Sequence, residues 1–285
     1  MARSNPEGGH IIAAGEVGSY SVCPQAWYLS YVKREKASRM GNVNTNSIRG
    51  QDLHRDWSRF FEESLTFLTW FRYLAMLLCM MLVVFLTVNS HREPLYEVFK
   101  LSYRNLGLQL LVLVMICAWL MRVFDREARK RHEDSGFSRN EVALSIDSGS
   151  LLPEREYIST RQGLAGKPDA LVQEGDIIIP VERKPLARKL RDRYVAQLLV
   201  YMRLVGEFEG RNPPHGYLLL GPNCRRVKVV NAAGKQAWVE ELLNEMRAIL
   251  NGAEPKPKPH PKKCAGCEVR ERCKSRADLS DSNDS

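Results

Sequence analysis

The chain has 285 residues, of which 44% are hydrophobic and 26% charged, with 42 Lys and Arg against 33 Asp and Glu. These proportions exclude a wholly disordered chain, a fibrous protein and a transporter with many membrane spans. The net charge of +9 indicates a polyanionic partner, either a nucleic acid or an acidic lipid surface.

The first 64 residues contain two predicted helical stretches, 17–32 and 49–62. A Cys23-Pro24 pair interrupts the first stretch, and the apolar residues of the second recur at helical spacing. Residues 1–64 are too few to bury a sufficient core alone, so we expect them to be the first part of a domain that continues later in the chain.

Two apolar runs, at residues 73–88 and 106–121, each contain sixteen residues without a charge. A helix needs about 20 apolar residues to cross a bilayer, and each run reaches that length if Arg72 or Arg122 at its end extends toward the headgroups. Two buried helices of a water-soluble core are the alternative, but runs that are apolar on every face argue against it. We predict a transmembrane helical hairpin over residues 65–124. Basic residues follow the second run, and they predict that both ends of the hairpin lie in the cytoplasm.

The remaining chain is predicted to be mixed α/β. A core over residues 125–252 is followed by a Pro- and Lys-rich linker with a cysteine-containing segment, 253–276, and by a disordered polar tail, 277–285. The predicted elements of the core are a two-stranded hairpin at 167–172 and 177–184, a helix at 186–205, strands at 217–220 and 227–230, and a helix that Asn231 caps and that ends near Leu250.

Three cysteines near the end of the chain, Cys264, Cys267 and Cys273, form a C-x2-C-x5-C pattern. Cys23, at the other end, is the remaining candidate for a fourth ligand, since Cys224 lies in a predicted turn. Four thiolates bind either zinc or an iron–sulfur cluster. The absence of a second C-x2-C pair in the sequence makes zinc the less favoured of the two. A reduced tail without a metal is the third reading.

Acidic residues and a lysine occupy the two strands of the predicted hairpin. Asp169 lies in the first strand, and Glu182 and Lys184 end the second, two residues apart and therefore on one sheet face. Two carboxylates can hold Mg²⁺ or Mn²⁺, which would activate water at a scissile phosphate, and Lys184 would stabilise the transition state. An ordinary salt bridge on a solvated strand remains the alternative.

The segment after Lys184 carries a group of cations, Arg188, Lys189, Arg191 and Arg193, at the predicted start of a helix. Gln197 and Tyr201 follow one turn apart on one face of that helix. Cations beside a predicted phosphate site are typical of nucleic-acid binding, although surface charge runs are also common on solvated faces.

At this point the chain resembles the RecB-type branch of the PD-(D/E)XK nucleases, and in particular the iron–sulfur exonucleases related to the CRISPR-adaptation nuclease. The resemblance rests on six motifs in the family's order: Cys23-Pro24, Gly50-x-x-x-His54, Gly166-x-x-Asp169, Glu182-x-Lys184 after Pro180-Val181, Gln197-x-x-x-Tyr201, and the three cysteines at 264, 267 and 273. It covers residues 17–65 and about 145–274, and the predicted hairpin is an insertion between them.

The resemblance implies a restriction-endonuclease-like mixed sheet flanked by helices and a role for each motif. His54, Asp169, Glu182 and the carbonyl of Arg183 would hold Mg²⁺ or Mn²⁺, and Lys184 would orient the nucleophilic water. Gln197 and Tyr201 would support the site and contact DNA. Cys23 and the three C-terminal cysteines would hold a 4Fe–4S cluster that joins the two ends of the chain.

The sequence therefore predicts a membrane-anchored, metal-dependent DNA nuclease, with exonuclease action expected from the family. It would lie at the cytoplasmic membrane, with the nuclease domain and both termini in the cytoplasm and with protein partners in DNA processing or defence. The alternatives are a non-catalytic, membrane-tethered DNA-binding protein, a zinc-stapled membrane adaptor, and a CRISPR-adaptation nuclease. The predicted hairpin counts against the last, because those nucleases are typically soluble.

Overall fold

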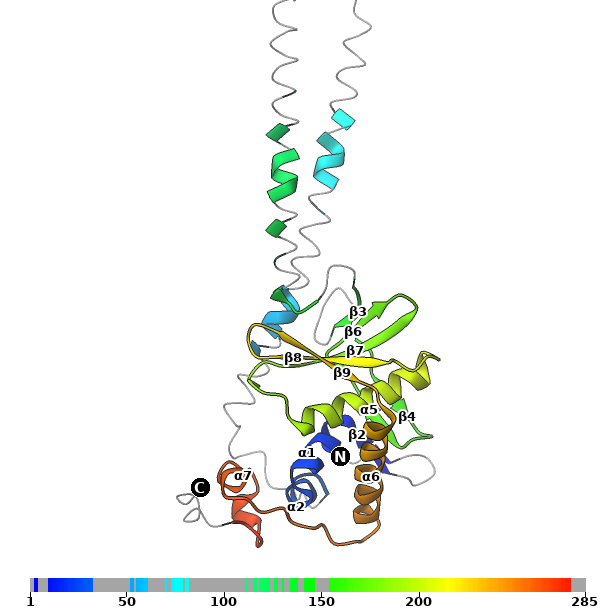
Figure 1. Cartoon of the computed structure of the whole chain (residues 1–285), viewed down its shortest axis with the longest axis vertical. Helices are drawn as coiled ribbons and strands as arrows, with labels where there is room; N and C mark the ends of the chain where they lie inside the picture. The colour runs from blue at the N-terminus through cyan, green and yellow to red at the C-terminus, as the bar shows by residue number, and fades with distance from the viewer. Residues whose placement is uncertain are drawn as a thin grey trace, which may run out of the picture. The chain divides into compact units, whose positions relative to one another are not determined.

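The protein divides into two compact units in a computed structural model (Figure 1). The structure describes residues 3–4, 10–32, 52–53, 55–60, 70, 73–78, 80–81, 111, 115–116, 118–123, 126–127, 130, 134–137, 141–146 and 154–277. Residues 1–58 and 140–285 form one unit, here called the discontinuous unit, and residues 59–139 form the inserted unit.

A five-stranded sheet is the centre of the discontinuous unit. Its strands are β3 (Val142–Ile146), β6 (Ala170–Glu174), β7 (Ile177–Lys184), β8 (His215–Leu220) and β9 (Arg225–Val230), in the spatial order β3-β6-β7-β8-β9. The predicted hairpin is confirmed as β6 and β7, which are antiparallel with Ala170 opposite Val181. Gly175, with φ of +60°, supplies the left-handed conformation that its tight turn needs.

A second sheet has four short strands, which the sequence analysis did not predict. They are β1 (Arg3–Ser4), β2 (His10–Ala13), β4 (Tyr157–Ser159) and β5 (Leu164–Gly166), in the order β1-β2-β5-β4. β2 and β5 are parallel and come from opposite ends of the unit's sequence. The sheet therefore helps to join residues before the inserted unit to residues after it.

Helix α5 (Asp192–Phe208) joins the parallel strands β7 and β8 and packs between the five-stranded sheet and α1 (Ala14–Val22), as Figure 1 shows. Its residues Leu198, Met202 and Val205 are fully buried. The prediction that this helix begins at Leu186 is wrong. Pro185 and the two following residues form a turn, in which the amide of Ala187 donates to the carbonyl of Lys184 at 3.0 Å. The chain is non-helical from this turn up to Arg191.

The predicted helix at 17–32 is three elements, because the chain breaks at Cys23. α1 ends at Val22, and α2 (Pro24–Trp27) and a π-helical turn (Tyr28–Val32) follow. Cys23 is extended, with φ of −161° and ψ of 110°. The following Pro24 disfavours helical backbone at Cys23 and is itself well suited to the first position of α2.

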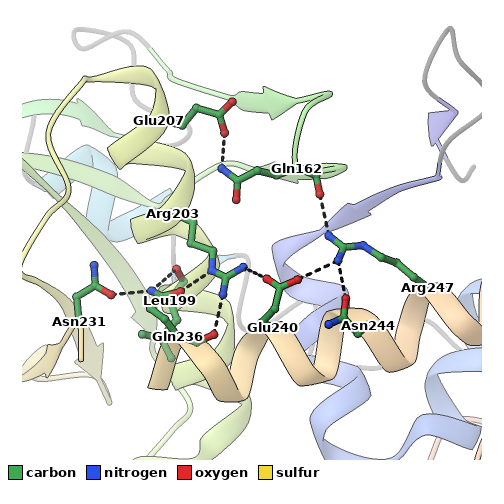
Figure 2. A network of polar contacts seen from close by, with 9 residues as sticks. All are labelled: Gln162, Leu199, Arg203, Glu207, Asn231, Gln236, Glu240, Asn244 and Arg247. Carbon is green, nitrogen blue, oxygen red and sulfur yellow. Dashed lines mark hydrogen bonds and ion pairs between the residues drawn. The ribbon is translucent and has the colours of Figure 1, made fainter. Parts of the chain in front are cut away.

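Helix α6 (Ala233–Leu250) is fastened to α5 by polar contacts (Figure 2). Arg203 on α5 donates to the carbonyl of Gln236 at 2.6 Å and forms an ion pair with Glu240. The prediction that Asn231 caps α6 is wrong, since Ala232 is the N-cap and no side chain bonds there. The Asn231 amide instead donates to the carbonyl of Pro213 at 2.8 Å and accepts a bond from Gln236 at 2.6 Å.

The C-terminal segment contains a short helix, α7 (Pro261–Ala265), and a 3-10 turn (Arg270–Arg272). The Pro- and Lys-rich start of the predicted 253–276 segment has no helix or strand as far as His260. Pro261 then begins α7, because proline fits the first turn of a helix. Residues 278–285 of the predicted tail lie outside the described residues.

The predicted membrane hairpin falls largely outside the described residues, within the inserted unit. Among the residues that are described, none belongs to a helix with the length and apolar character needed to cross a membrane.

Candidate active site

The two predicted carboxylates lie at the end of the β6–β7 hairpin that is remote from its turn. Asp169 directly precedes β6, and its Oδ2 accepts a hydrogen bond of 2.6 Å from the amide of Arg183 on β7. Asp169 is 9% exposed and Glu182 2%. Burial of two carboxylates on neighbouring strands costs free energy unless cations or hydrogen-bond donors surround them. The groups around Asp169 and Glu182 therefore bear on the function of the site.

Glu182 is held from two directions. Lys184 on the same strand forms an ion pair with Glu182 Oε1, and Gln197 on α5 donates to the same oxygen at 2.8 Å. Gln197 Nε2 also lies 2.8 Å from the hydroxyl of Tyr201, one turn along α5. These contacts bring together Glu182 and Lys184 from one strand with Gln197 and Tyr201 from one helix.

The electrostatics of Lys184 and Tyr201 follow from this geometry. Burial lowers the pKa of Lys184, but the charges of Glu182 and Asp169 outweigh it, and the net pKa is raised. The pKa of Tyr201 lies well above its usual value, first because of burial and then because of the same two carboxylates. Lys184 is therefore a cation and Tyr201 a neutral phenol at physiological pH.

Arg183 points its side chain to the opposite face of the sheet. Its Nη1 donates to the carbonyl of Leu53 at 2.8 Å, its guanidinium lies 5.5 Å from the ring centre of Trp57, and its Nε contacts the thiol of Cys224 at 3.4 Å. These contacts bring the segment around residues 53–57 against the site strand. His54, the third predicted metal ligand, belongs to that segment but lies outside the described residues.

Cys224 and Tyr194 are residues whose contribution the sequence analysis missed. Cys224 is buried against Arg183 and has a φ of +47°, although the sequence marked it only as a turn residue. Tyr194 on α5 is buried, with Lys184 Nζ 5.6 Å from its ring centre and Arg193 Nη2 donating to its hydroxyl at 2.6 Å. A tyrosine three residues before Gln197 was the available signal, because that spacing places both on one helix face.

The basic residues occupy a loop that leaves the active-site strand. Arg188, Lys189 and Arg191 lie in residues 185–191, which join β7 to α5, while Arg193 lies in the first turn of the helix. The first three are exposed. The cations therefore extend from Lys184 along a loop, which differs from the predicted row on a helix.

The four predicted cluster ligands, Cys23, Cys264, Cys267 and Cys273, line one cavity of about 650 Å³. The thiols of the other three raise the pKa of Cys267, although its burial is the larger cause. The backbone groups of Ala277 and His260 lower the pKa of Cys264. Among the described residues, no three of these or other His, Cys, Asp and Glu side chains lie close enough together to hold a single metal ion.

A family model described as the PD-(D/E)XK nuclease superfamily matches residues 12–274. The chain belongs to this superfamily. No curated protein matches the sequence. Eleven or more chains of solved structures match; one, titled "Crystal structure of SSO0001", is 15% identical with a TM-score of 0.32, and the match covers 63% of this chain and 80% of that one.

Membership of the PD-(D/E)XK superfamily identifies a metal-dependent nuclease, and its members typically use Mg²⁺ or Mn²⁺. The α/β architecture, with mixed sheets flanked by helices, fits the expected restriction-endonuclease-like fold. The donor set fits such an ion, since Asp169 and Glu182 offer carboxylate oxygens, the ligands that hard divalent cations prefer. The narrower assignment to the iron–sulfur branch of this superfamily stays a prediction.

Proposed function

We propose that this PD-(D/E)XK nuclease is a membrane-anchored DNA exonuclease that uses Mg²⁺ or Mn²⁺ and carries a 4Fe–4S cluster. The observation that best supports nuclease chemistry is the position of Glu182. It is buried beside Asp169 and is held at one oxygen by both Lys184 and Gln197. A purely structural salt bridge would need neither the second carboxylate nor the amide.

Each residue has a distinct part in the proposed hydrolysis. Asp169, Glu182, the carbonyl of Arg183 and His54 would hold the ion, which when bound makes water more acidic and neutralises charge on the phosphate. The amide of Arg183 fixes Asp169 through the 2.6 Å bond. Lys184 donates to the attacking water or to the phosphate oxygens, and its charge is stabilised by the carboxylates that surround it.

The test is cleavage of end-labelled DNA by the purified full-length chain, in Mg²⁺ or Mn²⁺ and in chelator. We expect Lys184→Ala to lose about 10³-fold in rate, the size associated with removal of one transition-state donor. Glu182→Gln, which removes the charge of a proposed metal ligand, should lose cleavage as well. Lys228→Ala is the matched control and should retain activity, because this exposed lysine lies on β9, which β8 separates from the active-site strand β7. Full activity in both site variants would refute the assignment.

Two further comparisons define the substrate. Linear DNA, covalently closed circular DNA and RNA of the same sequence should be cleaved unequally, with linear DNA preferred if the enzyme acts from ends. Metal-dependent cleavage of the circle at the same rate would make the protein an endonuclease. Tight DNA binding without any cleavage would favour the alternative of a non-catalytic, membrane-tethered binding protein.

The cysteine cavity supports the cluster proposal. A mononuclear zinc site would draw all four sulfurs to about 2.3 Å from one point, whereas a four-iron cluster holds its thiolates further apart around a larger body. The support for a group shared by the four thiols is that all four line one cavity of about 650 Å³. Anaerobic purification should give a brown protein with about four irons per chain, and Cys23→Ala should lose the colour. Zinc in place of iron would refute this part.

Membrane anchoring rests on the two apolar runs in the inserted unit. Most of their described side chains are exposed, for example Met76 at 70% and Trp119 at 62%. Exposure of large apolar side chains on both runs is costly in water and is expected where lipid covers them. The full-length chain should sediment with membranes after washing at high salt and high pH, and a variant lacking residues 66–124 should not. Release of the full-length chain by salt alone would refute the anchor.

A further inference from the structure

Arg183 lies between Glu182 and Lys184 on β7, but its side chain is on the opposite face of the sheet. It is 5% exposed, and a charged side chain is rarely buried this far unless it pairs with an opposite charge. Among the described residues its partners are a backbone carbonyl, a thiol and an aromatic ring, with no carboxylate. Neutralisation of a buried acid therefore does not explain why an arginine occupies this position.

The Arg183 guanidinium contacts a helical segment that lies 130 residues earlier in the chain. Residues 52–53 and 55–58 of this segment are helical, and Leu53 and Trp57, four residues apart, share one helix face. Arg183 Nη1 donates to the Leu53 carbonyl at 2.8 Å, and its guanidinium carbon lies 5.5 Å from the ring centre of Trp57. One side chain therefore contacts both ends of one helical turn.

The strand side of this contact is itself held in place. Arg183 belongs to β7, which has strands on both sides, and its amide donates to Asp169 Oδ2 at 2.6 Å. Its Nε contacts the thiol of Cys224 at 3.4 Å. The Cys224 amide donates to the Gly221 carbonyl at 3.3 Å, and the Gly221 amide donates to the Lys184 carbonyl at 3.0 Å. The guanidinium is thus fixed to the active-site strand, and the segment that it contacts is placed relative to that strand.

The contacted segment includes the third predicted metal ligand. Leu53 directly precedes His54 in the chain, and consecutive Cα atoms are about 3.8 Å apart, so a fixed Leu53 limits where residue 54 can lie. The proposed metal site then depends on Arg183 in three ways. Its amide fixes Asp169, its carbonyl is a proposed ligand, and its side chain fixes the neighbour of His54.

We propose that Arg183 is a positioning residue, which sets residues 52–58 against β7 and so brings His54 to the ion that Asp169 and Glu182 hold. Its side chain acts through the segment and contacts neither the ion nor the DNA. This rests on the proposed nuclease function, because His54 is a ligand only if the site holds a metal ion.

The test is Arg183→Met in the purified full-length chain, because the flexible, unbranched methionine can fill the space of the arginine stem without its donors or its charge. Arg226→Met is the matched control. Arg226 lies on the same sheet face two strands away, since Arg183 is opposite Leu219 and Leu219 is opposite Arg226. Its guanidinium also covers an aromatic ring, 3.4 Å from the ring centre of Tyr217. Trp57→Leu removes the same contact from the segment side.

Two measurements are made on each variant. Hydrogen exchange of peptides that cover residues 52–58, in chelator, reports how firmly the segment is held. Calorimetric titration with Mn²⁺ alone reports the metal affinity, and Glu182→Gln identifies the binding that belongs to this site. We expect Arg183→Met and Trp57→Leu to exchange faster over residues 52–58 and to bind Mn²⁺ about tenfold more weakly or worse, as for loss of a partner behind a metal ligand. Arg226→Met should stay within twofold of the wild type in both measurements.

Unchanged exchange in Arg183→Met would overturn the proposal. Faster exchange with an unchanged Mn²⁺ affinity would also overturn it, and would leave the nuclease function standing if the wild type cleaves DNA. An equal loss of affinity in Arg226→Met would show a general effect of destabilisation and would overturn it too. A wild type that binds no Mn²⁺ would instead overturn the proposed metal-dependent nuclease, and the positioning role with it. If Arg183→Met does not fold, the same results in Trp57→Leu decide.

Discussion

Gly18 is the position where the packing of α1 on α5 allows no side chain. A Cβ built on Gly18 would lie 2.6 Å from the backbone carbonyl oxygen of Arg193, about 1 Å closer than the usual contact between such atoms of about 3.5 Å. The obstructing atom is backbone, so it cannot move aside by a change of rotamer. In Gly18→Ala, α1 must therefore shift away from the helix that carries Gln197 and Tyr201.

The magnitude follows from two opposing terms. Overpacking of a core contact costs about 1–3 kcal/mol, while alanine in place of glycine favours a helix by about 1 kcal/mol. Gly15→Ala, three residues earlier in the same helix, has the second term without the first, because its Cβ meets nothing within 4 Å. The free energies of unfolding of the two variants should thus differ by about 1–3 kcal/mol, with Gly15→Ala the more stable.

The assay is urea or thermal unfolding of the two variants and the wild type under one set of conditions. A difference of this size corresponds to a Tm gap of about 2–12 °C for a domain of this length. Gly18→Ala should also lose activity, since the shift moves α1 relative to α5, the helix that carries Gln197 and Tyr201. A Gly18→Ala protein as stable as Gly15→Ala would refute the reasoning that the helix contact is backbone against backbone.

Three further outcomes test other parts of the structure. Tyr201→Phe, which removes the hydroxyl 2.8 Å from Gln197, should lower the cleavage rate about tenfold, with kcat affected more than KM and with a melting temperature close to that of the wild type. The pKa of His215 lies below 6.5, because burial and the charges of Lys228 and Arg226 outweigh the charge of Glu174. The unfolded chain therefore binds a proton at His215 more readily than the folded chain, and the free energy of unfolding should fall as the pH drops below 6.5. Thermal melts of His215→Gln should lack this part of the decline. Arg203→Met should lower the free energy of unfolding by about 1–3 kcal/mol in urea titrations, whereas Arg211→Met, from an exposed pair with Asp176, should change it by less than about 0.5 kcal/mol.

The elements that the sequence predicted correctly are those with a strong local pattern. The β6–β7 hairpin has apolar strands around a Glu174-Gly175-Asp176 turn, and α5 has a long apolar periodicity. The four-stranded sheet could not be found in the same way. Its strands are two to four residues long, and they are stable only because β2 pairs with a strand more than 150 residues away in the sequence. Long-range pairing of this kind leaves no periodic signal.

Much of the candidate site was also accessible from sequence, because residues two apart on a strand and four apart on a helix must share a face. That rule alone brings Glu182 to Lys184 and Gln197 to Tyr201. The start of α5 was predicted six residues too early, since basic residues are compatible with a helix and only the turn at Pro185 shows that they are not in one. Tyr194 was missed because its contact with Lys184 depends on how α5 crosses β7, which is a tertiary property.

The cysteine-lined cavity also has a consequence for the order of events during protein synthesis. Its lining comes from residues around Cys23, from residues 191–193 and from residues between Pro257 and Arg276. The β6–β7 hairpin with its carboxylates is translated well before the last of these segments. A nascent chain therefore holds its hydrolytic residues for some time without the closing segment. The cavity is complete only once the segment between Pro257 and Arg276 has also been made.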